Sequence, residues 1–189
     1  MVDDSVEPGP VEAWLRGPLE GVHPLVAPTV YAYMQALEDL AHWTGGLSDA
    51  QIWSRPHGLA PVGFQLRHIA GSVERLTTYL RGEQLTSQQL EAARGEMEPG
   101  LGRAALLEMV TRSLQNSEGV IRALNPATLT NARAIGRKQL PVTVAGLVVH
   151  LAEHTQRHVG ELIITTKLAR MTELAVLARP PLKVPGETV

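Results

Sequence analysis

The fold and the function of this chain both depend on one stretch, His150-Leu151-Ala152-Glu153-His154-Thr155-Gln156-Arg157-His158, which lies inside the longer run 142–170. Its histidines recur at every fourth residue. Four residues of an α-helix turn through about 400°, so a helix would carry all three along one stripe. Two imidazoles one turn apart can bind a single metal ion. The third cannot bind the same ion, because the first and third histidines are eight residues apart and their Cα atoms lie roughly 12 Å apart along the helix axis.

Helical phase favours His154 and His158 as the metal-binding pair. At about 100° per residue, His158 falls inside the apolar arc of the helix, His154 lies at its edge, and His150 turns toward water or the flank. A metal site buried in a helical bundle must face the core. The alternative is a helix with polar edge residues and one partly buried histidine. One helix supplies only two ligands, so a metal site here would need a third ligand from another part of the chain.

Length and charge restrict the classes of protein that this chain can be. Its 189 residues suffice for one well-packed domain. Lysine and arginine (17) nearly balance aspartate and glutamate (19), giving a net charge of −2. This balance argues against a nucleic-acid binder that works by phosphate neutralisation. The apolar runs are shorter than the ~20 residues of a membrane span, and the acidic start does not resemble a signal peptide. We therefore expect a soluble cytoplasmic protein with no membrane partner.

The chain contains no cysteine. Disulfides, thiolate ligands and a cysteine nucleophile are therefore all excluded. Any metal must be bound by histidine, carboxylate and water, and any thiol chemistry must use a thiol that the substrate brings.

Apolar side chains at helical spacing predict an all-α four-helix bundle, with long helices from residue 24 or 28 to 43 and over 61–80, 103–124 and 141–170. Ser48 and Gln51 match a capping box that opens a short turn. The connection 82–102 carries a candidate helical turn at 87–94, and 127–141 is a second connection, with an extended excursion but no convincing strand pair. We expect a bundle domain at 23–171, an irregular tail at 1–22 docked by Trp14, and a loose tail at 172–189.

Outside the histidine stretch, the sequence leaves the role of one further histidine, His68, undecided. The sequence shows no internal repeat, basic tract, glycine-rich phosphate loop or Gly-x-Ser-x-Gly nucleophile elbow. His68 lies on the flank of the apolar seam of helix 61–80, in a polar row with Gln65, Ser72 and, further round, Tyr79. A flank residue can reach a neighbouring helix or face water, and phase alone does not decide which. No role is predicted for the remaining histidines His23, His42 and His57.

Three segments together resemble the DinB-like (DinB/YfiT-like) family of metalloenzymes. Residues 46–56 (GLSDAQIWSRP) resemble the turn after that family's first helix. Residues 66–70 (LRHIA) resemble the second-helix segment that bears its first histidine ligand. Residues 150–160 (HLAEHTQRHVG) resemble its fourth-helix signature, whose last two histidines are the other ligands. The matches lie in the family's order and spacing between about residues 24 and 170.

The resemblance implies an up-down-down-up helix order and a metal site made by His68, His154 and His158. Imidazole ligands suit zinc first, then nickel, and also iron. Characterised relatives include transferases and isomerases that depend on small thiols such as bacillithiol or mycothiol. The chain departs from the signature at Glu161, where the family commonly has glutamine. This acid could tune the metal or only cap a polar edge.

Four further residues are candidates for the surroundings of the site, namely His150, Glu161, Ser72 and Tyr79. His150 could hydrogen-bond at the mouth of the site or face water, and we expect water. Three classes of function remain open. They are a divalent-metal enzyme that uses a low-molecular-weight thiol on an electrophilic small-molecule substrate, a non-catalytic metal- or ligand-binding module such as a sensor, and a bundle with structural histidines. The apolar stripes could also support a homodimer.

Overall fold

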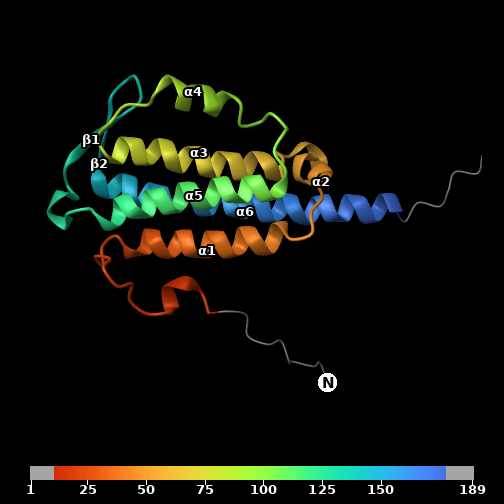
Figure 1. Ribbon diagram of the computed structural model, residues 1–189, viewed down its shortest axis with the longest axis horizontal. Coiled ribbons are helices and arrows are strands. Elements are labelled where there is room, and N and C mark those ends of the chain that lie inside the picture. The colour runs from red at the N-terminus through yellow and green to blue at the C-terminus, as the bar shows by residue number, and fades with distance from the viewer. Residues whose placement is uncertain (1–10, 178–189) are drawn as a thin grey trace, which may run out of the picture.

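The computed structural model describes residues 11–177 and is mostly helical, as predicted (Figure 1). Within these residues it has six α-helices, three short 3-10 turns and one pair of strands. The α-helices are α1 (Ala27–Thr44), α2 (Asp49–Trp53), α3 (Val62–Leu80), α4 (Ser87–Arg94), α5 (Arg103–Arg122) and α6 (Val144–Leu177). The four predicted long helices correspond to α1, α3, α5 and α6.

The four long helices pack side by side (Figure 1). Helix α3 contacts both α5 and α6, and α1 contacts the same two helices. Helix α4 packs against the outside of α3, on the long connection between α3 and α5. The two helices that carry the candidate histidines, α3 and α6, are therefore direct neighbours.

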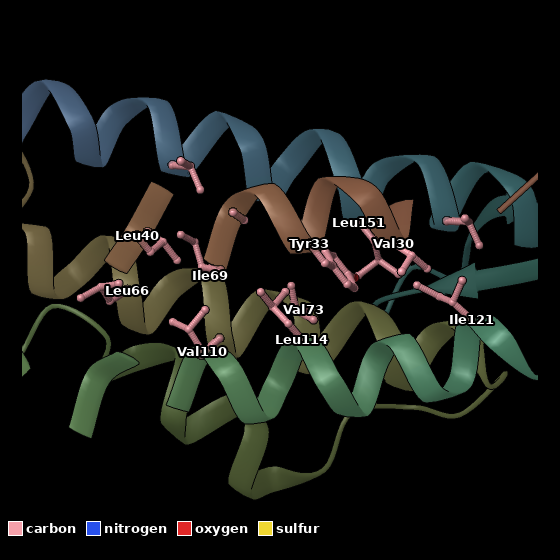
Figure 2. Close-up of a cluster of buried hydrophobic side chains, with 14 of the residues drawn as sticks. Val30, Tyr33, Leu40, Leu66, Ile69, Val73, Val110, Leu114, Ile121 and Leu151 are labelled. Carbon is pink, nitrogen blue, oxygen red and sulfur yellow. The ribbon is translucent and has the colours of Figure 1, made fainter. Parts of the chain in front are cut away.

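Apolar side chains from all four long helices share one core (Figure 2). The seam predicted for helix 61–80 is buried, since Leu66, Ile69 and Val73 have no exposed surface. Tyr33 enters this core from α1, and its hydroxyl lies 2.9 Å from that of Ser117 on α5. The buried phenol is therefore hydrogen-bonded, as a polar group inside a core must be.

The prediction of no strand pair is wrong. Strands β1 (Ala132–Ile135) and β2 (Leu140–Thr143) form an antiparallel hairpin that leads into α6. Pro141 therefore belongs to β2 and does not begin the helix. The hydroxyl of Thr143 accepts a hydrogen bond from the backbone N–H of Gly146 at 3.0 Å, as a capping side chain does. Neither strand alternates buried with exposed side chains, so the sequence lacks the alternating pattern that identifies a strand.

The ends of the domain also differ in part from expectation. Near the N-terminus, the short turn η1 (Ala13–Leu15) docks through Ala13, which is 1% exposed, whereas Trp14 is 60% exposed. The predicted anchoring role of Trp14 is therefore wrong. At the other end α6 continues beyond residue 170 to Leu177. The predicted tails at 1–22 and 172–189 lie partly outside the described residues, which begin at 11 and end at 177.

Two capping boxes fix the short helices on either side of α3. The hydroxyl of Ser48 accepts from the N–H of Gln51, whose side chain accepts in turn from the N–H of Ser48, as predicted. Thr86 and Gln89 form the same reciprocal pair at the start of α4. The N-terminus of each short helix is therefore fixed by its own capping box.

Over 11–177, every helix is too short or too polar to cross a bilayer.

Candidate metal centre

Three histidines from two neighbouring helices converge at one place. His68 comes from α3, and His154 and His158 come from successive turns of α6. One ring nitrogen of each lies within 4.8 Å of the others. The ring centroids of His68 and His158 are 4.4 Å apart, and those of His154 and His158 are 4.6 Å apart. The structure therefore brings together the two residues that helical phase selected and the third that the family resemblance implied.

A buried carboxylate fixes the ring of His68. Its Nδ1 lies 2.7 Å from Oε2 of Glu96, whose other oxygen accepts from Arg75 at 2.6 Å. Phe64 stacks against the same imidazole with the ring planes 20° apart. Burial raises the pKa of Glu96, but the hydrogen bonds from His68 and Arg75 outweigh it and lower that pKa below its ordinary value. An ionised carboxylate only accepts, so Nδ1 of His68 carries a proton and donates to it.

A chain of hydrogen bonds fixes the ring of His158 in the same way. The amide of Gln65 donates from Nε2 to Glu161 at 2.9 Å, and its Oε1 faces Nδ1 of His158 at 2.8 Å. Glu161 also lies 3.2 Å from that Nδ1. Because a carboxylate accepts and cannot donate, Glu161 sets the orientation of the Gln65 amide. The oxygen of Gln65 then requires the proton on Nδ1 of His158, which leaves a lone pair on Nε2.

His154 completes the group from the middle of α6. Its Nε2 lies 3.2 Å from Nε2 of His68. Its Nδ1 is buried and has no hydrogen-bond partner among the described residues. Burial, followed by the electrostatic influence of His158 and His68, lowers the pKa of His154 to about 4. Burial and then His68 also lower the pKa of His158, against a smaller opposing influence of Glu161. Both imidazoles are therefore neutral at pH 7, the form that binds metals.

The donor set fits a divalent cation. Two nitrogens on a tetrahedral zinc ion at 2.0–2.1 Å lie about 3.3 Å apart, close to the spacing between Nε2 of His68 and Nε2 of His154. Nδ1 of His68 and Nδ1 of His158 both face acceptors, so Nε2 is the nitrogen of each ring that could bind a metal. Histidine ligands of metals usually have such an outer hydrogen-bond partner. Three protein ligands leave a coordination position open, the arrangement of a catalytic zinc site.

Two of the predicted surrounding residues lie beside the histidines. Glu161 contacts both His158 and Gln65, although its side chain is 49% exposed. The ring of His150 lies 5.2 Å from that of His154. Its Nδ1 pairs with Glu153, and its side chain is 43% exposed. His150 therefore borders the cluster while turned toward solvent.

The other predicted surrounding residues make different contacts. Ser72 lies one turn after His68, but its hydroxyl donates to the carbonyl of Ile69 in its own helix. Tyr79 is buried eleven residues after His68, about 16 Å along the helix axis. Gln156, in the turn between His154 and His158, is half-buried and donates to the carbonyl of Ala32 on α1 at 2.8 Å.

Sequence reasoning missed the partners that orient the histidines. Gln65 lies one turn before His68 in the predicted polar row, and its position there could have identified it. Glu96 lies 28 residues after His68, in the connection between α4 and α5. No motif surrounds it, so the sequence offered no signal for its role.

Comparison with known protein families gives a match over most of the chain. A family model described as the DinB superfamily matches residues 32–162. The match spans well over half of the chain and includes all three converging histidines. No curated protein matches the sequence. From the extent of the family match, the chain belongs to the DinB superfamily.

Proposed function

We propose that the chain binds one divalent metal ion through His68, His154 and His158 and acts as a metal-dependent transferase or isomerase. Its reaction would activate a low-molecular-weight thiol for attack on an electrophilic small molecule. The observation that carries the proposal is the convergence of three imidazoles, two of which have Nδ1 held by an acceptor. Zinc is the first candidate, followed by nickel and iron.

The residues around the site prepare it for a cation. Glu96 and Gln65 hold the rings of His68 and His158 with Nε2 available. Burial keeps His154 neutral, so protons do not compete for its nitrogen at pH 7. A bound divalent ion would act as a Lewis acid that lowers the pKa of a water or thiol at its open position.

The thiol must come from a second molecule, because the chain has no cysteine. In the proposed transfer the thiol loses its proton to solvent and its sulfur forms a bond to an electrophilic carbon of the substrate. The bond from that carbon to its leaving group breaks, and the leaving group departs with the electron pair. The resemblance to thiol-dependent relatives supports this class of reaction. Assays with bacillithiol, mycothiol and glutathione against a panel of electrophiles test it. Conjugation or isomerisation by the metal-loaded protein supports the proposal, and stoichiometric metal without turnover of any pair would favour a non-catalytic binding module.

We also propose an order for the directions of the four long helices. We place α1 and α6 in one direction and α3 and α5 in the other, the up-down-down-up order of a four-helix bundle. The connections drawn in Figure 1 support this order, since the segment bearing α4 returns along the length of α3 before α5 begins.

Metal content separates binding by these histidines from a purely structural role. Protein purified without chelator should carry about one divalent ion per chain by elemental analysis. His68→Ala, His154→Ala and His158→Ala should each lose the ion, because two imidazoles bind it weakly. His150→Ala is the matched control and should retain most of it, because His150 faces solvent. Wild-type protein that neither carries metal nor takes up Zn²⁺ or Ni²⁺ would rule out the proposed function.

A further inference from the structure

The connection between α3 and α5 carries the buried carboxylate of Glu96 across the outside of α3. Glu96 is only 7% exposed and joins Nδ1 of His68 to Nη1 of Arg75. We propose that Glu96, seated over Gly71 and tied to Arg75, is a positioning residue for metal binding. This connection would then complete a site whose ligands all lie on α3 and α6. The inference rests on the proposed metal-binding function.

Gly71 makes room for this carboxylate. It lies in the interior of α3, where glycine is less favourable than alanine. A Cβ at this position would lie 2.5 Å from Oε1 of Glu96 and 2.7 Å from Nη1 of Arg75. Both separations are too short for non-bonded atoms, so any side chain at residue 71 must displace the ion pair. The close approach of Glu96 is therefore a physical reason for a glycine in the middle of this helix.

Contacts on both sides of Glu96 hold its backbone in place. The guanidinium of Arg67 donates to the carbonyl of Gly95 at 3.0 Å and to that of Glu98. Arg67 also lies over the ring of Trp53, 5.0 Å from its centroid. The indole of Trp53 donates to the carbonyl of Leu101 at 2.9 Å. Residues 95–101 are therefore anchored to α2 and α3, and the carboxylate is presented from a fixed loop.

The position of Glu96 also separates His68 from a surface cleft. This cleft, about 730 Å³ in volume, lies along α3 and α5 beneath the α4 connection, and Glu96 and Gly71 line it. Nδ1 of His68 points toward Glu96, whereas Nε2 points toward His154. Without the carboxylate, water from the cleft could reach Nδ1, and neither tautomer nor ring orientation would be fixed. Outer partners of this kind typically contribute 10–100-fold to metal affinity.

Three variants and one matched control test the inference by Co²⁺ titration, which reports affinity and the absorption spectrum of the bound ion without any assay of turnover. Gly71→Ala and Glu96→Ala should each weaken Co²⁺ binding by about 10–100-fold and change the spectrum. Glu96→Gln should bind Co²⁺ more tightly than Glu96→Ala, because the amide oxygen of glutamine can accept from Nδ1 of His68. The control is Gly119→Ala, in the last turn of α5 with open space around its Cβ position. It should leave affinity unchanged and raise Tm by about 2–4 °C.

The outcomes separate this inference from the function on which it rests. Wild-type affinity and spectrum in both Gly71→Ala and Glu96→Ala would overturn the positioning role while leaving metal binding intact. Equal loss in Glu96→Gln and Glu96→Ala would overturn the role of the oxygen that accepts from His68. Wild-type protein that binds no Co²⁺ would overturn both the inference and the proposed function. Metal-free Gly71→Ala should have a Tm close to that of the wild type. Weakened Co²⁺ binding at an unchanged Tm shows that the loss of affinity is local to the site.

Discussion

Glu161 is the residue at which this chain departs from the signature it resembles, where glutamine is common. Its carboxylate orients Gln65, and Gln65 in turn faces His158. Glutamine at this position could still accept from Gln65 through its own Oε1, but it would no longer carry charge beside His158. The contacts favour an influence on the metal site over a simple polar edge.

We predict that Glu161→Gln weakens metal binding by less than the roughly 10-fold that is typical of outer-sphere partners. The effect is small because Glu161 is 49% exposed and Gln65 retains an acceptor. Competition with a chelator of known affinity measures the change. A loss as large as that of a ligand variant would mean that Glu161 itself binds the ion.

The pH dependence of the metal-free protein follows from His154. The pKa of His154 falls from an ordinary value of 6.5 to about 4 on folding, mainly because the ring is buried. Above pH 6.5 the ring is neutral in both states and stability is complete. Between pH 6.5 and about 4 the unfolded chain binds the proton first, so the free energy of unfolding decreases as pH falls. His158, whose pKa is also lowered, acts in the same direction.

We therefore predict that the Tm of chelator-treated protein decreases from pH 7.5 to pH 5. His154→Gln should show a smaller decrease, because it removes the group with the lowered pKa. Thermal melts by circular dichroism across this range provide the measurement. Parallel profiles for the variant and wild type would contradict the assignment.

The candidate residues differed in how far the sequence could identify them. Spacing on one helix identified His154 and His158, because helical phase relates residues that are close in sequence. Helical phase placed His68 on the flank of its helix but did not show whether that flank faces a neighbouring helix or water. Only the family resemblance resolved this choice. Glu96 reaches His68 by a tertiary contact over 28 residues, and neither periodicity nor a motif encodes such a contact.

At the scale of single elements, the short helix α2 depends on its capping box. Ser48 and Gln51 satisfy N–H groups that a five-residue helix cannot satisfy internally. We predict that Ser48→Ala lowers the free energy of unfolding by about 1 kcal/mol. Urea denaturation measures this loss, and Ala50→Ser, on the exposed face of the same helix, serves as a control. An unchanged denaturation midpoint in Ser48→Ala would show that α2 is held by Trp53 and Ile52 alone.

The helices were predictable from the sequence, whereas the short strand pair was not. The four long helices each bury an apolar stripe, and that stripe repeats often enough to be recognised. The hairpin β1–β2 has four residues in each strand, and most of their side chains are half-buried or exposed. Its pairing depends on the turn at 136–139, so the sequence predicted only an extended connection there.

For the molecule as a whole, the packing of the four long helices places the candidate ligands of α3 and α6 next to each other. The core beneath the site includes Leu66 and Ile69 from α3 and Leu151 and Leu162 from α6, all fully buried. Because these side chains flank the histidines in sequence, packing of the two helices also sets the distance between His68 and the pair on α6. The packing of the bundle therefore brings the three candidate ligands together, as a preorganised metal site would require.

Anomalous diffraction tests this account most directly. Crystals grown from protein purified without chelator, or soaked in Zn²⁺, should be measured on both sides of the absorption edge of the metal. We expect one strong peak about 2.0–2.1 Å from nitrogens of His68, His154 and His158 together. The absence of a peak at these residues in zinc-soaked crystals, or a peak bound by only one of them, would contradict it.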